Sequence, residues 1–261
     1  MTTLRTLLLM AAICGSCLAQ DTFEIQVYEY ETVPKNKWNL ETHLNYIGSG
    51  TRSFEGTVAP TNNQFHMTYE LTRGLSENWE LAGYLVTARR VGYPGPIEFA
   101  GWRVRPRWKA PEQWNWPVKF SMSLEVGFPR KMYEDSSPTI ELRPVFEKRF
   151  GKFQLDVNPV LARALHGPGT DSGWEFEPAI RAAYQLTRRF EPSLEYYGAT
   201  GPVFGPLPRG EQVHLFFPGA DIQINENVVW NVGVGWAATP AGNQLTYKMR
   251  LGVLFGSGVR R

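Results

Sequence analysis

Residues 244–256 alternate apolar and polar side chains along almost their whole length. The apolar set comprises Leu245, Tyr247, Met249, Leu251, Val253 and Phe255, and the polar set carries Lys248 and Arg250. Successive side chains of a strand point to opposite faces, so this stretch predicts a strand with one apolar and one cationic face. In a soluble sandwich the apolar face packs inward, whereas in a membrane barrel it faces lipid and the cations line the lumen.

The same alternation recurs from residue 38 onward, and helical periodicity is absent. In residues 117–128 apolar positions such as Phe120 alternate with Lys119 and Glu125. In residues 212–224 the alternation breaks near Phe216, which predicts a β-bulge that turns Asp221 inward beyond it. We expect twelve strands, at residues 38–49, 64–73, 79–88, 99–109, 117–128, 139–150, 153–166, 174–186, 190–200, 212–224, 228–237 and 244–256.

The connections between these strands alternate in length. The odd-numbered connections are long and the even-numbered ones mostly tight, with residues 110–116 as the exception. Outer-membrane barrels have long extracellular loops and short periplasmic turns, and an even strand count returns both termini to the periplasm. A soluble sandwich has no reason for this alternation. The sequence therefore predicts an all-β fold, a closed antiparallel up-and-down transmembrane β-barrel of about 12 strands.

Charged residues gather on the polar faces of the predicted strands, while the opposite faces carry Trp, Phe and Leu near the strand ends, as interfacial girdles do. A soluble barrel of this size would have to fill its interior with those aromatics. In a bilayer, closure also satisfies every backbone amide. We expect the lumen to be lined by Arg103, Arg105, Arg107, Lys119, Glu125, Glu141, Arg143, Glu147, Glu175, Glu177, Arg181, Glu195, Lys248 and Arg250.

Residues 1–19 have the features of a signal peptide, because Arg5 precedes an apolar stretch and Cys17-Leu18-Ala19 fits a small-x-small cleavage site. A lipoprotein anchor on Cys17 is the less favoured alternative, since Cys14 stands where a lipobox has Leu. Cleavage after residue 19 removes both cysteines, which excludes disulfides and thiol chemistry from the mature chain. We expect residues 20–37 to form a periplasmic lead-in and residues 38–261 the barrel.

The net charge of +2 produces no strong field, and no Lys/Arg run with interleaved aromatics occurs, so we expect no nucleic-acid partner. No run of about 18 apolar residues follows the signal peptide, so strands are expected to cross the membrane. The expected location is the bacterial outer membrane of a Gram-negative cell, with its lipids as partners.

Residues 69–81 (YELTRGLSENWEL), residues 24–28 and the closing Leu251, Val253 and Phe255 resemble bacterial outer-membrane barrels of the transporter or MetA-pathway-of-phenol-degradation type. The resemblance covers most of the mature chain in pattern, and its turn motif identifies architecture better than cargo. It implies a passive channel or uptake protein for small solutes. Phe255 resembles the signal that the barrel-assembly machinery reads, although residues 256–261 follow it, so this machinery is an expected partner.

The lumen charges allow two interpretations. The Arg103, Arg105 and Arg107 ladder can face Glu175, Glu177, Glu191 and Glu195 across the barrel and create a field that orients polar solutes. Alternatively, the charges pair with one another and fill the lumen as a salt-bridge network.

Two further function classes remain open, a lipase-like surface enzyme and a non-conducting structural or adhesion barrel. The four histidines show no Ser-His-Asn motif, so we expect no enzymatic activity. His43 and His66 would form a metal site with Glu41 and Glu70, but a polar barrel lining explains them more simply, and we expect no cofactor. The loop acids Glu134, Asp135 and Asp171 suit calcium or are simply solvated.

Overall fold

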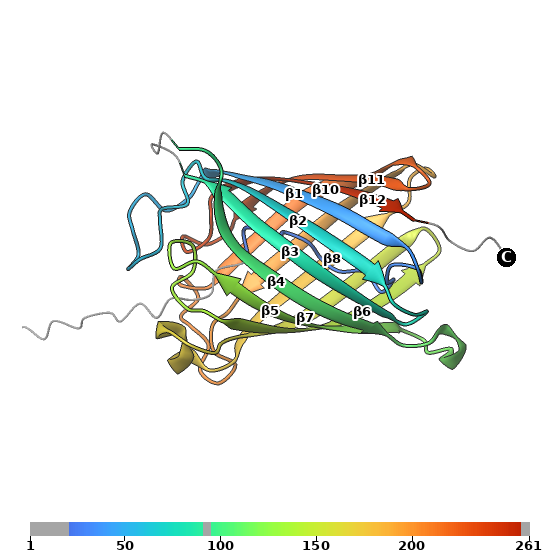
Figure 1. Ribbon diagram of the computed structural model, residues 1–261, viewed down its shortest axis with the longest axis horizontal. Helices are drawn as coiled ribbons and strands as arrows, with labels where there is room; N and C mark the ends of the chain where they lie inside the picture. The colour runs from blue at the N-terminus through green and yellow to red at the C-terminus, as the bar shows by residue number, and fades with distance from the viewer. Residues whose placement is uncertain (1–20, 91–94, 257–261) are drawn as a thin grey trace, which may run out of the picture.

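The computed structural model describes residues 21–90 and 95–256, so the predicted signal peptide lies outside the described residues. The described chain forms a closed barrel of twelve strands, each antiparallel to its neighbours (Figure 1). This confirms the predicted fold. The strands are β1 (Trp38–Ser49), β2 (Phe65–Gly74), β3 (Trp79–Arg89), β4 (Glu98–Lys109), β5 (Lys119–Pro129), β6 (Thr139–Phe150), β7 (Phe153–Ala164), β8 (Glu175–Tyr184), β9 (Phe190–Ala199), β10 (Val213–Asn225), β11 (Val228–Ala237) and β12 (Leu245–Phe255).

The barrel closes where β1 pairs with β12. Trp38 lies opposite Phe255 at one end of this ladder, and Tyr46 lies opposite Tyr247 towards the other. The two terminal strands therefore pair with each other, and the described barrel is closed without an open edge. Among the described residues, no helix has the length and apolar character needed to cross a membrane.

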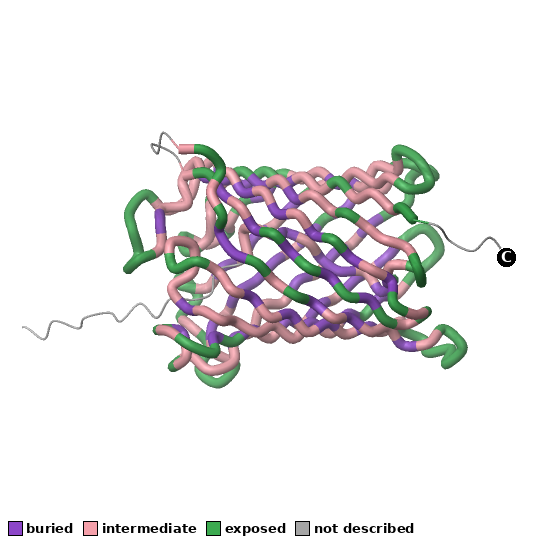
Figure 2. Tube along the Cα trace, in the orientation of Figure 1, coloured by how far each residue is buried: buried purple, intermediate pink, exposed green. Residues whose placement is uncertain are grey.

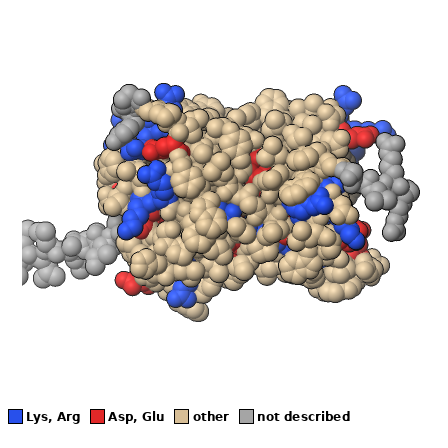
Figure 3. Space-filling model, in the orientation of Figure 1, with Lys and Arg blue, Asp and Glu red and all other residues tan. Residues whose placement is uncertain are grey.

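Burial along the strands is the reverse of that in a soluble protein. On β2 the polar residues His66, Thr68 and Glu70 are buried, whereas Leu71, which follows them, is exposed. Buried and more exposed residues alternate in this way along the strands (Figure 2). The outer surface in Figure 3 is largely uncharged, and most of the charged side chains visible on this face lie towards the two ends. Buried charge combined with an exposed apolar band identifies lipid as the solvent of the outer face.

The long connections lie at one end of the barrel and the mostly short ones at the other, as the sequence predicts. The exceptional turn between β4 and β5 contains the short 3₁₀ helix η1 (Glu112–Trp114). Trp114 and Trp116 lie with ring centroids 5.0 Å apart, and Trp116 approaches Phe120 at 6.4 Å. Aromatic rings gather where a bilayer meets water, so this turn contributes to an interfacial aromatic belt. A second 3₁₀ helix, η2 (Pro168–Ser172), lies in a long connection at the other end.

The bulge predicted near Phe216 is wrong. The pairing of β9 with β10 continues without a shift from Val213 to Ile222, and the only irregularity between β10 and β11 lies at Gln223/Asn225. The odd-numbered residues of β10 face inward throughout. Asp221 therefore points inward without a bulge, and the lumen face of this strand begins with apolar residues.

Candidate functional site in the barrel lumen

Residues 21–37, expected as a lead-in ahead of the barrel, run through its interior without forming a strand (Figure 1). We call them the lumen segment. Side chains from opposite parts of the closed wall reach the segment: Arg107 on β4, Asn158 on β7 and Lys248 on β12 all hydrogen-bond to its backbone. Only a segment enclosed by the barrel can be contacted from all of these directions.

The lumen segment spans the barrel from one end to the other. Asn36 donates to the carbonyl oxygen of Gly74 at 3.0 Å, beside the tight turn between β2 and β3. At the other end, the carbonyl oxygen of Thr22 accepts from Asn45 at 2.9 Å and lies 3.0 Å from Nδ1 of His66, near the long connections. Phe23 stacks on the ring of His66 at 4.2 Å.

Wall side chains satisfy the segment's backbone polar groups. The Tyr28 amide donates to Oδ1 of Asn158 at 2.7 Å, the Tyr30 amide to Glu147 at 3.0 Å and the Val33 amide to Glu80 at 2.6 Å. The segment's carbonyls accept from Arg107, Arg143, Lys248 and Asn158. Buried backbone groups need such partners, and here side chains supply what neighbouring strands supply in a sheet.

The segment is acidic, with Asp21, Glu24, Glu29 and Glu31 and no cation before Lys35. Asp21 pairs with Arg103, and Glu31 accepts from Lys109 at 2.6 Å. Burial alone would raise the pKa of both carboxyls. Arg103 nevertheless holds the pKa of Asp21 below its usual value, and Lys109 and Lys119 do the same for Glu31. The segment therefore neutralises part of a basic wall.

Tyr28 lies at the centre of these contacts. Its hydroxyl donates to Glu24 at 2.6 Å and lies 3.1 Å from the hydroxyl of Tyr84 on β3. The guanidinium carbons of Arg105 and Arg143 lie 4.6 Å and 4.3 Å from its ring centroid. Cation–π attraction strengthens when the groups are desolvated, as they are here. The Tyr28 ring therefore attracts both guanidinium groups and offsets part of the repulsion between them.

One side of the lumen is apolar. Ile25 and Val27 pack in a buried cluster with Tyr197 on β9 and with Val213, Leu215 and Phe217 on β10, among others. Gly235 on β11 lies under Phe217, and a Cβ at this glycine would overlap the Phe217 ring. Burying these apolar groups favours retention of the segment by about 25 cal/mol for each Å² removed from water.

The arginine ladder pairs locally. Arg103 contacts Glu125 at 3.1 Å in addition to Asp21 of the segment. Arg105 pairs with Glu70 and lies 3.5 Å from Glu80, which also lies 3.7 Å from Arg107. These partners come from β2, β3, β5 and the segment, so the ladder does not face Glu175 or Glu177 across an open lumen.

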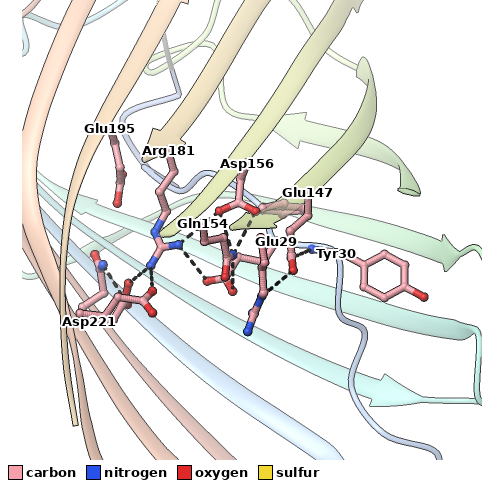
Figure 4. A network of polar contacts seen from close by, with 12 residues as sticks. Glu29, Tyr30, Glu147, Gln154, Asp156, Arg181, Glu195 and Asp221 are labelled. Atoms are coloured by element: carbon pink, nitrogen blue, oxygen red, sulfur yellow. Dashed lines mark hydrogen bonds and ion pairs between the residues drawn. The ribbon is translucent and has the colours of Figure 1, made fainter. Parts of the chain in front are cut away.

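A second charged cluster surrounds Arg181 on β8. Its guanidinium contacts Asp156 at 3.2 Å, Glu191 at 2.5 Å and Asp221 at 2.7 Å, and lies 3.8 Å from Glu29 of the segment (Figure 4). Four carboxylates thus share one buried cation. These contacts agree with the second interpretation of the lumen charges, in which they pair with one another as a salt-bridge network.

The remaining predicted residues also lie in or beside these networks. Arg143 pairs with Glu141 at 2.7 Å, Glu195 with Lys248, Arg250 with Glu41 at 3.2 Å, and Glu147 with Arg149 at 3.0 Å. Lys119 is partly exposed and lies 3.5 Å from Glu31. Glu175 is buried, and Oε1 of Glu177 is buried without a hydrogen-bond partner among the described residues.

A cavity of about 190 Å³ remains between the segment and the wall. Gln26, Tyr28 and Glu31 line it from the segment, and Glu70 and Arg250 line it from the wall. Within the described part of the chain, the lumen therefore contains a cavity lined by polar side chains. The lumen segment and the wall residues that bind it separate this cavity from the rest of the lumen.

The histidine geometry does not form a Ser-His pair. His66 contacts Gln64 at 2.6 Å and His214 contacts Tyr196 at 2.8 Å, while His43 lies among carboxylates. No serine hydroxyl hydrogen-bonds to a histidine ring in the described residues. His66 is turned away from His43 towards Gln64 and Thr22, so the two do not form the metal pair considered from the sequence.

The barrel is similar to solved structures of bacterial outer-membrane channels. The COG4313 outer membrane channel from Pseudomonas putida F1 has a TM-score of 0.58 at 10% identity, covering 89% of this chain and 100% of that one. The NanC porin has a TM-score of 0.53 at 7% identity, covering 84% and 100%. The KdgM porin in complex with disordered oligogalacturonate has a TM-score of 0.50 at 9% identity, covering 85% and 99%. At these identities the likeness shows the fold.

No family model matches the sequence, and no curated protein matches it. The feature shared with the solved structures is the closed antiparallel β-barrel fold.

Proposed function

We propose that the protein is a passive outer-membrane channel for small polar solutes and that the lumen segment closes it. The observation that carries this proposal is the way in which the segment is held. Wall side chains bind its backbone, and no sheet hydrogen bond joins residues 21–33 to a strand. The segment can therefore leave while the twelve-stranded ladder, and with it the barrel, stays intact.

Displacing the segment frees hydrogen-bond donors on the wall. Arg107, Arg143 and Lys248 now donate to its carbonyl oxygens, and Arg103 to a carboxylate. A solute with carbonyl, hydroxyl or carboxylate oxygens would take over these contacts, because buried cations need compensating partners. Small polar solutes with such oxygens are the substrate class that this wall suits.

We also propose two finer assignments. The motif of residues 69–81 lies at the tight turn between β2 and β3 and supports membership of the transporter or MetA-pathway-of-phenol-degradation type. Phe255 ends β12 on the outer face, where the barrel-assembly machinery would read it.

Single-channel recording in planar lipid bilayers tests the channel proposal. The full-length mature protein should be closed or open only briefly, whereas a variant lacking residues 21–33 should show steady openings. In this deletion variant, replacing Arg103 by Glu should shift selectivity towards cations. Closed behaviour of both proteins would contradict the channel and favour a structural or adhesion barrel, and phospholipase activity of closed protein would favour the enzyme.

A further inference from the structure

Glu24, His43 and Glu70 converge inside the barrel. Glu24 belongs to the lumen segment, His43 to β1 and Glu70 to β2, and one ligand atom from each lies within 4.8 Å of the other two. All three residues are at least nine-tenths buried, with exposed fractions of 4%, 1% and 4%. Nε2 of His43 has no hydrogen-bond partner among the described residues. A buried imidazole nitrogen without a partner, facing carboxylates, requires an explanation.

The spacing around this nitrogen fits a shared ion better than hydrogen bonds. Nε2 of His43 lies 3.8 Å from Oε2 of Glu70 and 3.5 Å from Oε2 of Glu41. Both distances are too long for a good hydrogen bond. Two ligand atoms that bind one tetrahedral Zn²⁺ at about 2.0–2.1 Å lie about 3.3–3.4 Å apart, so small shifts would bring these atoms into place.

The carboxylates are already oriented by other groups. Oε1 of Glu70 accepts from Arg105 and from the Thr72 hydroxyl, which leaves Oε2 directed at His43. Oε1 of Glu24 accepts from the Tyr28 hydroxyl at 2.6 Å. Metal-binding carboxylates are held in this way by outer partners that fix which oxygen is presented.

We propose that Glu24, His43 and Glu70, with Glu41 as a fourth ligand, bind a Zn²⁺ ion that fastens the lumen segment to β1 and β2. One imidazole nitrogen with carboxylate oxygens suits zinc, whereas calcium and magnesium prefer oxygen alone. Glu41 and Glu70 also line the lumen cavity, so the proposed site borders polar space inside the barrel. The proposal does not depend on whether the barrel conducts.

Isothermal titration of the folded full-length protein in detergent with ZnCl₂ tests this site. We expect one Zn²⁺ per chain, and at least a tenfold weaker dissociation constant in His43→Ala and in Glu24→Gln. Glu24→Gln changes a residue outside the strands, so the barrel wall remains as it is. His214→Ala is the matched control, because that ring contacts Tyr196 and Gln212 away from the cluster.

Folding of each variant is checked by heat-modifiable migration in gels. The proposal is overturned if the full-length protein binds no Zn²⁺, if His43→Ala and Glu24→Gln bind it as tightly as the parent, or if His214→Ala weakens it equally.

Discussion

Asn158 on β7 hydrogen-bonds to both backbone polar groups of Tyr28 in the lumen segment. Its Oδ1 accepts from the Tyr28 amide at 2.7 Å, and its Nδ2 donates to the Tyr28 carbonyl oxygen at 3.0 Å. An amide side chain carries an N–H donor and a C=O acceptor, as a peptide group does. The Asn158 side chain therefore pairs with the Tyr28 backbone as one residue of a neighbouring strand would. It fixes the segment at mid-lumen without making the segment part of the sheet.

Replacing Asn158 by Ala should loosen the segment. Two hydrogen bonds of about 0.5–1.5 kcal/mol each are lost, and each 1.4 kcal/mol raises the ratio of released to bound segment about tenfold. Single-channel recordings should show more frequent openings than those of the parent. Asn243→Ala is the control, because the Asn243 side chain accepts from the Thr61 hydroxyl at 2.7 Å and not from the segment. Equal opening of the two variants would show that Asn158 does not retain the segment.

Acid should release the segment. The pKa values of Asp21 and Glu31 are held below their ordinary values by Arg103 and by Lys109 with Lys119. A carboxyl whose pKa is lower when the segment is bound than when it is released stabilises the bound segment at pH values above its ordinary pKa. This stabilisation is lost as the pH falls through the lower, bound-state pKa. Channel opening should therefore increase below about pH 4, near and under the ordinary carboxyl values.

The double variant Asp21→Asn, Glu31→Gln provides the control for this pH effect. It should open more often at neutral pH and respond less to acid than the parent. If the parent and the double variant respond equally to acid, Asp21 and Glu31 are not the groups whose titration releases the segment.

A charge on the outer face should be costly at mid-strand. Leu251 lies in the middle of β12 with its side chain outward, so Leu251→Arg should lower the free energy of unfolding in lipid vesicles by about 2–4 kcal/mol. Leu245→Arg, on the same face at the strand end, should cost only about 0–1 kcal/mol. Urea titration followed by tryptophan fluorescence measures both. Equal small costs would contradict a lipid-facing outer surface.

Loss of the Phe255 ring should impair assembly. Phe255 ends β12 on the exposed face, opposite Trp38 of β1. Phe255→Ala should reduce the amount of folded barrel in outer membranes several-fold, measured as the heat-modifiable band. Tyr247→Ala removes another exposed aromatic from the same face of the same strand and should have a smaller effect. Equal losses would show that general packing, and not recognition of Phe255, is responsible.

The strands and the barrel were predictable because alternation is a local property of the sequence. Residues 117–128 show which side chains share a face, and β5 begins and ends within two residues of that prediction. The arginine ladder was found for the same reason. Two of its partners, Glu70 and Glu125, were also on predicted polar faces. Glu80 and Asp21 were missed as partners, because Glu80 is an isolated acid in an apolar strand and Asp21 lies outside the predicted barrel.

The path of the lumen segment could not be predicted from local pattern. Its contacts join Tyr28 to Asn158 and Ile25 to Lys248, far apart in the chain. One signal was present: Val213, Leu215 and Phe217 place apolar groups in the lumen register of β10, and an apolar lumen face needs an apolar partner. The sequence interpretation assigned that pattern to a bulge instead.

Hydrogen exchange of the lumen segment tests the central claim most directly. The amides of Tyr28, Tyr30 and Val33 donate to wall side chains inside the barrel. Mass spectrometry of the full-length protein in detergent or lipid, with peptides covering residues 21–33, should show exchange that is slowed as strongly as in neighbouring strands. Exchange of these amides at the rate of a free peptide, while the strands remain protected, would contradict a lumen occupied by its own N-terminal segment.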